Sequence, residues 1–211
     1  MKVVNRTYSE AESLLKEGDI LLFRGSGLIS NLIKIAGAGQ YSHVAIASRV
    51  NGYWEVVEFR EWYGGRAVNL ENYIKLSEKT NTQIDVYRSV DEYNTLTFNE
   101  ETNEVIKTQS QFDGHKVTRC MRKLTGLPYS YKRIWLLLKI KLFKIHLLRN
   151  LEKITDDLPT KEIIYPVCST VLAHCFSIND YDILKCKSDE WTEPTHFANS
   201  TRSNYLWTFS V

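Results

Sequence analysis

The chain has 211 residues, of which 43% are hydrophobic, 25% charged and 12% aromatic. This composition is typical of a globular protein and excludes a disordered or fibrous chain. With 27 basic and 25 acidic residues the formal net charge is only +2, which excludes a protein that binds nucleic acid over its whole surface. We therefore expect a single folded domain over residues 1–211 and no nucleic-acid partner.

The N-terminal sequence and the cysteines indicate the cellular compartment in which the protein is expected. Residues 1–19 lack the continuous apolar run of a secretory signal. Cys120, Cys168, Cys175 and Cys186 include no CxxC pair, and a chain of this length does not need disulfides to be stable. We expect a protein of the reducing cytoplasm.

The first part of the chain alternates helix and strand patterns. Two β-rich runs within residues 41–61 are separated by Asn51-Gly52, the dipeptide that most strongly indicates a tight hairpin turn. These runs predict neighbouring antiparallel strands. The patterns before them predict a short helix at 8–17 that ends at Gly18, a buried strand in GDILLFRG (18–25) and a second helix at 28–36.

The middle of the chain predicts further elements of the same kind. Its sheet should have four or more strands, because TQIDVYRSV (82–90) has the alternation of another strand. A helix is predicted through KVTRCMRKL (116–124), and the turn residues Gly126-Leu127-Pro128 should end it. The other segments are a turn with a short helix or loop in GGRAVNLENYI (64–74) and a polar connection at 91–109.

Residues 131–153 combine seven Lys or Arg residues and one Glu with many large apolar residues. Lysines interrupt the apolar run, so we do not expect a transmembrane span. One interpretation is an amphipathic helix that covers the core while its lysines reach solvent. The other is an interfacial element that contacts anionic lipid or shapes an apolar acyl pocket.

Cys168 lies in PVCSTVLAHCF (166–176), where the sequence predicts the start of a helix. The unpaired N–H groups of a first helical turn favour a thiolate, so this position suits a nucleophile. The alternative is a buried structural thiol, because free cysteines are among the most buried residues.

A base and an acid for Cys168 are available on the predicted hairpin. His43 opens the strand HVAIAS, and Glu58 stands in the apolar run of the next strand, where an unpaired carboxylate would be costly to bury. They lie eight positions before and six positions after the Asn51-Gly52 turn, and such offsets permit cross-strand contact. A lone strand histidine can also be purely structural.

The motifs together resemble the permuted papain-like amidases, which are YiiX-like members of the NlpC superfamily of cysteine peptidases and acyl-transferring enzymes. In the permuted branch the histidine and the third residue precede the cysteine, as His43 and Glu58 precede Cys168 here. The matching stretches are GDILLFRG (18–25), YSHVAIAS (41–48), VVEF (56–59), VNLENYI (68–74), DVYRSV (85–90), GLPYSY (126–131), VCSTVLAHCF (167–176) and EPTHFA (193–198).

The resemblance implies an α+β fold of the circularly permuted papain-like type, in which an antiparallel sheet packs against the helix that bears the nucleophile. It also implies the roles of nucleophile for Cys168, base for His43 and orienting acid for Glu58. The Cys168 backbone N–H would be one oxyanion donor, and Tyr41, which comes just before His43, is a candidate for another.

Two functional hypotheses follow. The first is a cysteine hydrolase or acyltransferase that acts on an amide, ester or thioester of a peptidoglycan-type peptide, an isopeptide or a lipid acyl group, with no cofactor and no metal. The second is a non-catalytic module on the same fold that binds lipid or peptide. In either case residues 131–153 are the candidate for peripheral membrane contact, and the sequence does not give the oligomeric state.

Overall fold

A computed structural model describes residues 3–25, 31, 34, 39–99, 101–131, 166–184, 189 and 192–210, without the side chains of 93, 95–99, 108 and 110. The predicted segment 131–153 lies outside this part apart from its first residue, and the predicted helix at 28–36 lies largely outside it. Among the described residues no helix is long and apolar enough to cross a membrane. Whether residues 1–211 form one domain therefore stays a prediction.

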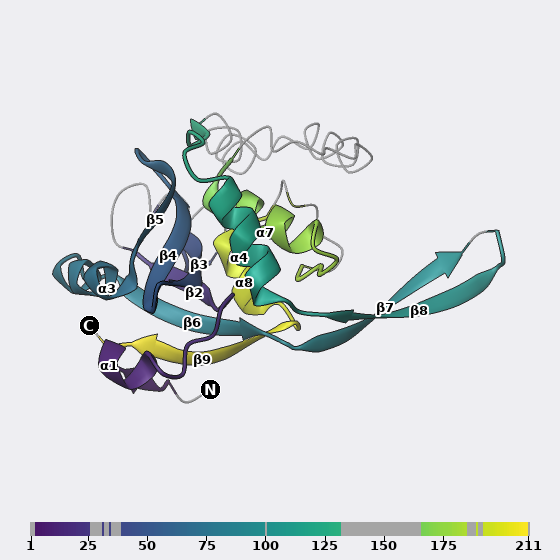
Figure 1. Ribbon diagram of the computed structural model, residues 1–211, viewed down its shortest axis with the longest axis horizontal. Helices are drawn as coiled ribbons and strands as arrows, with labels where there is room; N and C mark the ends of the chain where they lie inside the picture. The colour runs from purple at the N-terminus through teal and green to yellow at the C-terminus, as the bar shows by residue number, and fades with distance from the viewer. Residues whose placement is uncertain are drawn as a thin grey trace.

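The described fold is a mixed α+β arrangement built around one seven-stranded sheet with the strand order β1-β9-β6-β2-β3-β4-β5 (Figure 1). All its neighbouring strands are antiparallel except β1 and β9, which are parallel, so the expected antiparallel sheet has one exception. Its strands are β1 (Asn5–Arg6), β2 (Ile20–Arg24), β3 (His43–Val50), β4 (Tyr53–Arg60), β5 (Gly64–Asn69), β6 (Gln83–Ser89) and β9 (Ser203–Phe209).

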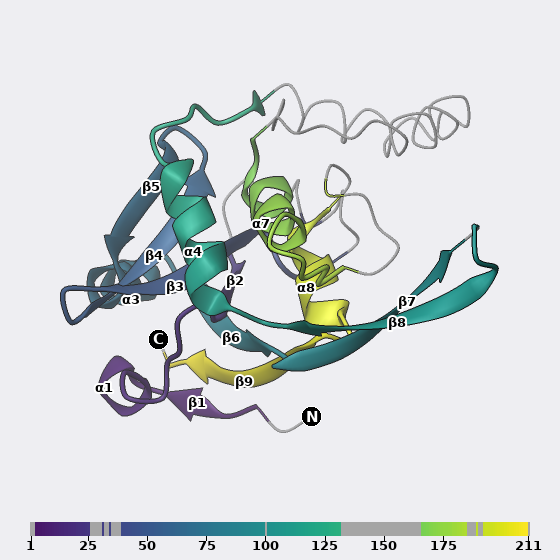
Figure 2. The same cartoon turned by 45° about the vertical axis from the view of Figure 1, so that its right-hand side comes forward.

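The helices lie over the sheet and around its edge (Figures 1 and 2). Helices α4 and α7 run side by side and share a core with the sheet that includes Val44, Ile46 and Phe59. A second core, with Leu21, Ala45 and others, includes residues of α3. The helices are α1 (Tyr8–Ala11), α3 (Leu70–Lys79), α4 (Gly114–Lys123), α7 (Cys168–Ser177) and α8 (Pro194–Asn199).

The β3–β4 hairpin forms as the sequence predicts. Val50 pairs with Tyr53 across a two-residue turn, and Asn51 and Gly52 have φ angles of 50° and 87°. Two successive positive φ angles are the hallmark of the turn that matches the twist of antiparallel strands, and Asn-Gly is the dipeptide that adopts it most readily.

Residues 91–109 do not form the expected polar connection. They lie mostly in β7 (Glu92–Asn99) and β8 (Glu104–Gln111), which pair antiparallel as a separate two-stranded sheet. In both views this hairpin projects away from the main sheet (Figures 1 and 2). Polar residues dominate both strands because a projecting hairpin has little core to cover, so the usual apolar signal of a strand is weak.

Candidate functional site

The hairpin brings His43 and Glu58 together. Glu58 pairs in register with Ala45, so His43 is two residues away on the neighbouring strand and shares its face of the sheet. The Nε2 atom of His43 donates a hydrogen bond to Oε2 of Glu58 at 2.7 Å, and both residues are buried. The predicted cross-strand contact therefore exists.

Glu58 is fully buried and held by three further side chains. Arg66, its register partner on β5, donates to Oε1 from Nε at 2.8 Å. Tyr73 of α3 donates to Oε2 at 3.0 Å, and Arg60 lies 3.8 Å from the same oxygen and bonds the Tyr73 hydroxyl. Burial acts to raise the pKa of Glu58, but His43, Arg60 and Arg66 outweigh it and lower the pKa to about 2. The carboxylate is therefore ionised.

His43 is cationic at neutral pH. Burial acts to lower its pKa, but a negative charge on the Cys168 sulfur and the Glu58 carboxylate outweigh burial and raise the pKa to about 9. Because Nε2 bonds Glu58, the other ring nitrogen, Nδ1, remains for the thiol. Nδ1 has no hydrogen-bond partner among the described residues, although Cys168 is close enough to raise the pKa of His43.

Cys168 is the first residue of α7. It is a free cysteine, and only 4% of its surface is exposed. Its backbone N–H makes no hydrogen bond within the described part of the chain, which is expected in a first helical turn. Unpaired N–H groups at this end of a helix favour negative charge, either on the sulfur or on an oxygen attached to a bound carbon.

Tyr41 does not have the free hydroxyl expected of an oxyanion donor. Its hydroxyl donates to Oδ2 of Asp85 at 2.6 Å and lies 3.1 Å from the hydroxyl of Tyr87. Asp85 is fully buried and also binds Arg24 and Thr208, so this network is complete without a ligand. The proposed role of Tyr41 stays a prediction, and its hydrogen bonding gives it no support.

Four residues near His43, Glu58 or Cys168 were not singled out from the sequence. Arg60, Arg66 and Tyr73 surround Glu58, and the fourth, Tyr129, lies in the same buried cluster as Cys168. Arg66 could have been found, because it is the residue opposite Glu58 once the β4–β5 hairpin is recognised. The other three depend on packing between elements that are distant in sequence.

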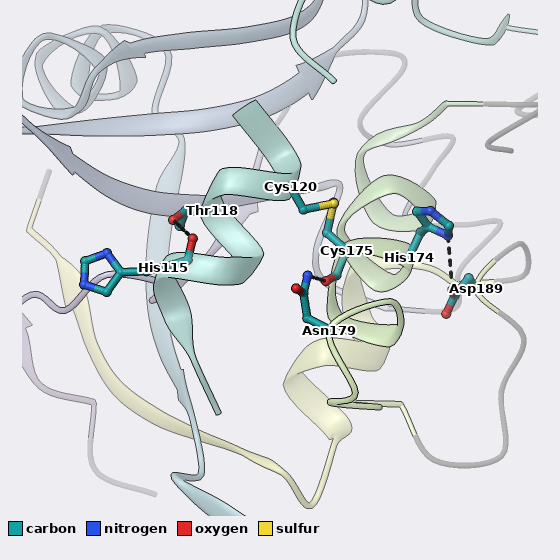
Figure 3. The surroundings of a disulfide bond; sticks show 7 residues. All are labelled: His115, Thr118, Cys120, His174, Cys175, Asn179 and Asp189. Carbon is teal, nitrogen blue, oxygen red and sulfur yellow. Dashed lines mark hydrogen bonds and ion pairs between the residues drawn. A yellow bond between two sulfur atoms is a disulfide. The ribbon is translucent and has the colours of Figure 1, made fainter. Parts of the chain in front are cut away.

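A disulfide joins Cys120 of α4 to Cys175 of α7 (Figure 3). The Cα atoms are 5.6 Å apart and the two residues are 55 positions apart in the sequence. Cys175 follows Cys168 by two helical turns, so the disulfide fixes the helix that carries the thiol. No pattern in the sequence indicated this pair. Disulfides persist mainly in oxidising compartments, so the bond does not support the expected cytoplasmic location, which stays a prediction.

The comparisons with known proteins show a similar fold. No protein-family model matches the sequence, and no curated protein matches it either. Among solved structures, the chain is similar to that of the metalloprotein YiiX from Escherichia coli O157:H7, with a TM-score of 0.55 and 16% sequence identity. The match covers 91% of this chain and 98% of that one.

The residues near Cys168 do not fit a metal ion. Both oxygens of Glu58 are engaged by Arg66, Tyr73 and His43, and the charges of Arg60 and Arg66 oppose the binding of a cation. Within the described ranges there is no group of three or more His, Cys, Asp or Glu residues that could hold a metal. The description of YiiX as a metalloprotein is therefore not carried over to this chain.

Proposed function

We propose that the protein is a cysteine hydrolase or acyltransferase of the permuted papain-like type, acting on an amide, ester or thioester through Cys168, His43 and Glu58. The observation that carries the proposal is the buried His43–Glu58 pair beside a free thiol at the start of a helix. A buried imidazole with one nitrogen on a carboxylate and the other towards a thiol is the arrangement that activates a cysteine nucleophile.

The reaction has two halves. In the first, the Cys168 thiolate attacks the carbonyl carbon, a C–S bond forms and an electron pair of the C=O bond moves to oxygen. When the C=O bond re-forms, the bond to the leaving group breaks and the leaving group takes a proton from Nδ1 of His43. In the second half, water or another acceptor gives its proton to His43 and attacks the thioester, and the thiolate is expelled.

Glu58 acts on the histidine throughout this cycle. By accepting the Nε2 hydrogen bond it fixes the orientation of the ring, so that Nδ1 is directed at the sulfur, and its charge favours the imidazolium. Arg66 and Tyr73 in turn hold both oxygens of Glu58. The base is therefore positioned before the substrate binds.

The test is turnover of p-nitrophenyl acetate, an acyl thioester, an N-acyl amide and an isopeptide by the wild type and by Cys168→Ser and His43→Ala. We expect activity on at least one substrate, and its loss in both variants by at least about a thousandfold. The matched control is His174→Ala, a histidine of α7 whose ring lies 3.9 Å from Asp189; it should keep wild-type activity. Full activity in Cys168→Ser would overturn the proposal.

A further inference from the structure

Arg60, the last residue of β4, has a guanidinium group that the candidate site engages only in part. Its Nη1 atom lies 3.8 Å from Oε2 of Glu58 and donates a hydrogen bond to the hydroxyl of Tyr73. The side chain makes no other hydrogen bond or ion pair within the described ranges. Because 35% of it is exposed, the edge formed by Nε and Nη2 is available to a ligand.

The charge of Glu58 is shared among several groups and does not neutralise Arg60. Nε of Arg66 donates to Oε1 of Glu58 at 2.8 Å, and Nη2 of Arg66 lies 2.7 Å from the same oxygen. His43 bonds Oε2 at 2.7 Å, whereas the 3.8 Å separation of Arg60 is too long for a hydrogen bond. Three cationic side chains therefore surround one carboxylate. When a Cys168 thiolate pairs with His43, one positive charge is left over.

The guanidinium of Arg60 stays charged. Burial acts to lower its pKa, but Tyr73, Glu58, Glu61 and Cys168 outweigh burial and raise the pKa. Glu61 follows Arg60 in the sequence, yet no ion pair joins the two side chains in the part of the chain that the structure describes. Arg60 is therefore a permanent cation beside Glu58, with capacity to bind a further negative group.

The turn after Arg60 borders solvent and has a fixed conformation. The N–H of Tyr63 donates to the Arg60 carbonyl at 3.2 Å, and the N–H of Trp62 donates to the Tyr131 hydroxyl at 2.6 Å. Trp62 is 80% exposed and has a φ of 71°, which is rare for a large side chain. Such strained residues persist only where their surroundings hold them, and they are frequent at binding sites.

We propose that Arg60 binds a carboxylate of the substrate and so selects substrates that carry a negative charge near the bond to be broken. The inference rests on the proposed function and names its substrate class. The free edge of a guanidinium matches the two oxygens of a carboxylate, and the one positive charge left over in the site matches its single negative charge. Arg60 holds the carboxylate while Cys168 attacks the carbonyl carbon, and neither Arg60 nor the carboxylate changes its protonation.

The test compares the alkylation of Cys168 by iodoacetate and by iodoacetamide, two reagents that differ in charge and react in the same way. In both reactions the thiolate sulfur bonds to the methylene carbon, the C–I bond breaks and iodide leaves. The rates are measured at low ionic strength by mass spectrometry of the peptide that contains Cys168. The readout is the rate with iodoacetate divided by the rate with iodoacetamide.

We expect this ratio to fall about tenfold in Arg60→Gln, because a positive charge close to the carboxylate of the reagent is removed. Arg60→Lys keeps the charge and should retain most of the ratio. The matched control is Arg49→Gln, near the other end of the β3–β4 hairpin, where the guanidinium lies 5.7 Å from the ring centroid of Trp54. It removes the same charge and should leave the ratio unchanged.

A second assay tests the substrate class. The thioesters S-acetyl-3-mercaptopropionate and S-acetyl-3-mercaptopropionamide differ only in the carboxylate of the leaving group. We expect the kcat/KM of the wild type to be at least about tenfold higher for the anionic thioester. Arg60→Gln should lose this preference mainly through a higher KM, because the carboxylate is bound equally in the ground state and in the transition state.

The outcomes separate this inference from the proposed function. If Cys168→Ser is inactive but Arg60→Gln keeps the wild-type ratio, or the wild type does not prefer the anionic thioester, only the role of Arg60 is overturned. An equal fall of the ratio in Arg49→Gln would show a general effect of protein charge, which also overturns that role. If Cys168→Ser is as active as the wild type, the proposed function fails, and the role of Arg60 fails with it.

Discussion

The Nε2 atom of His43 lies 2.7 Å from the Oε2 atom of Glu58, with both side chains buried in the sheet. This pair determines the charge state of the histidine that faces the thiol. Removing the charge of Glu58 while keeping the shape of its side chain should therefore change the charge state of His43 more than it changes the fold.

In Glu58→Gln we expect the pKa of His43 to fall from about 9, because a carboxylate that favours the imidazolium is replaced by a neutral amide. The alkylation rate of Cys168, followed over a pH range from about 5 to about 10, reports the imidazolium–thiolate pair. The pH profile of the variant should be displaced from that of the wild type. An identical profile in the two proteins would contradict the coupling of Glu58 to His43.

The same pair predicts how stability depends on pH. The pKa of folded Glu58 is about 2, below its ordinary value of 4.5, so its stabilising contribution is present above pH 4.5 and is lost as the pH falls through about 2. The pKa of folded His43 is about 9, above its ordinary value of 6.5, so its contribution is present below pH 6.5 and is lost as the pH rises through about 9. The free energy of unfolding of the wild type, measured by urea titration at a series of pH values, should show both losses.

The variant Glu58→Gln is the control for this pH dependence. It lacks the group that titrates in acid, so the acid limb of its stability curve should be flatter than that of the wild type. Acid limbs of the same steepness would show that other carboxylates cause the loss.

The β3–β4 hairpin that carries His43 and Glu58 was the part of the candidate site that the sequence predicted best. The Asn51-Gly52 turn has a strong local signal and fixes the register, and the register alone places Glu58 beside His43. The position of Cys168 at the start of a helix follows from the local pattern around Pro166. For the hairpin and for the start of α7, the residues that specify the local structure lie within a few positions of the turn or of Cys168.

The remainder depends on contacts between distant segments. Tyr73 reaches Glu58 only because α3 packs against the sheet, and Tyr129 lies near Cys168 only because Ser130 bonds Pro166, 36 positions further along the chain. The pairing of Cys120 with Cys175 likewise requires α4 and α7 to lie side by side. No periodicity or turn signal specifies such contacts, and β7 and β8 were missed because their polar residues hide the strand pattern.

The disulfide should contribute measurably to stability. In the chain-entropy model, closing a loop of 55 residues lowers the conformational entropy of the unfolded chain and so raises its free energy by about 4 kcal/mol. We expect Cys120→Ser, or reduction of the wild type with a phosphine, to lower the free energy of unfolding by about 2–4 kcal/mol in urea titrations. The phosphine should leave the stability of Cys120→Ser unchanged. A wild type equally stable with and without the reductant would contradict the prediction.

Substitution of Gly64, the first residue of β5, tests whether the contact of this strand with Leu127 matters for the candidate site. The φ angle of Gly64 is +69°, and a Cβ atom there would clash with the carbonyl oxygen of Leu127. Gly64→Ala should therefore displace β5 from the segment that contains Leu127, destabilise the protein by roughly 2 kcal/mol or more and lower kcat.

Gly52→Ala is the matched control for Gly64→Ala. Gly52 also has a positive φ, of +87°, but no atom lies within 4 Å of the added Cβ. Gly52→Ala should therefore lower the free energy of unfolding only by the backbone strain, about 1 kcal/mol, and should leave kcat unchanged. Equal effects of the two substitutions on kcat would show that the contact with Leu127 does not matter for the site.

The most direct test of the central claim is to trap the acyl-enzyme. A substrate that the wild type hydrolyses is mixed with the protein, the reaction is stopped in acid within the first turnover, and the peptides are analysed by mass spectrometry. We predict an acyl group on the sulfur of Cys168 in the wild type, and its absence or slow formation in His43→Ala. Turnover without any acyl group on Cys168, or acylation of Cys168 at the same rate in His43→Ala, would contradict the account.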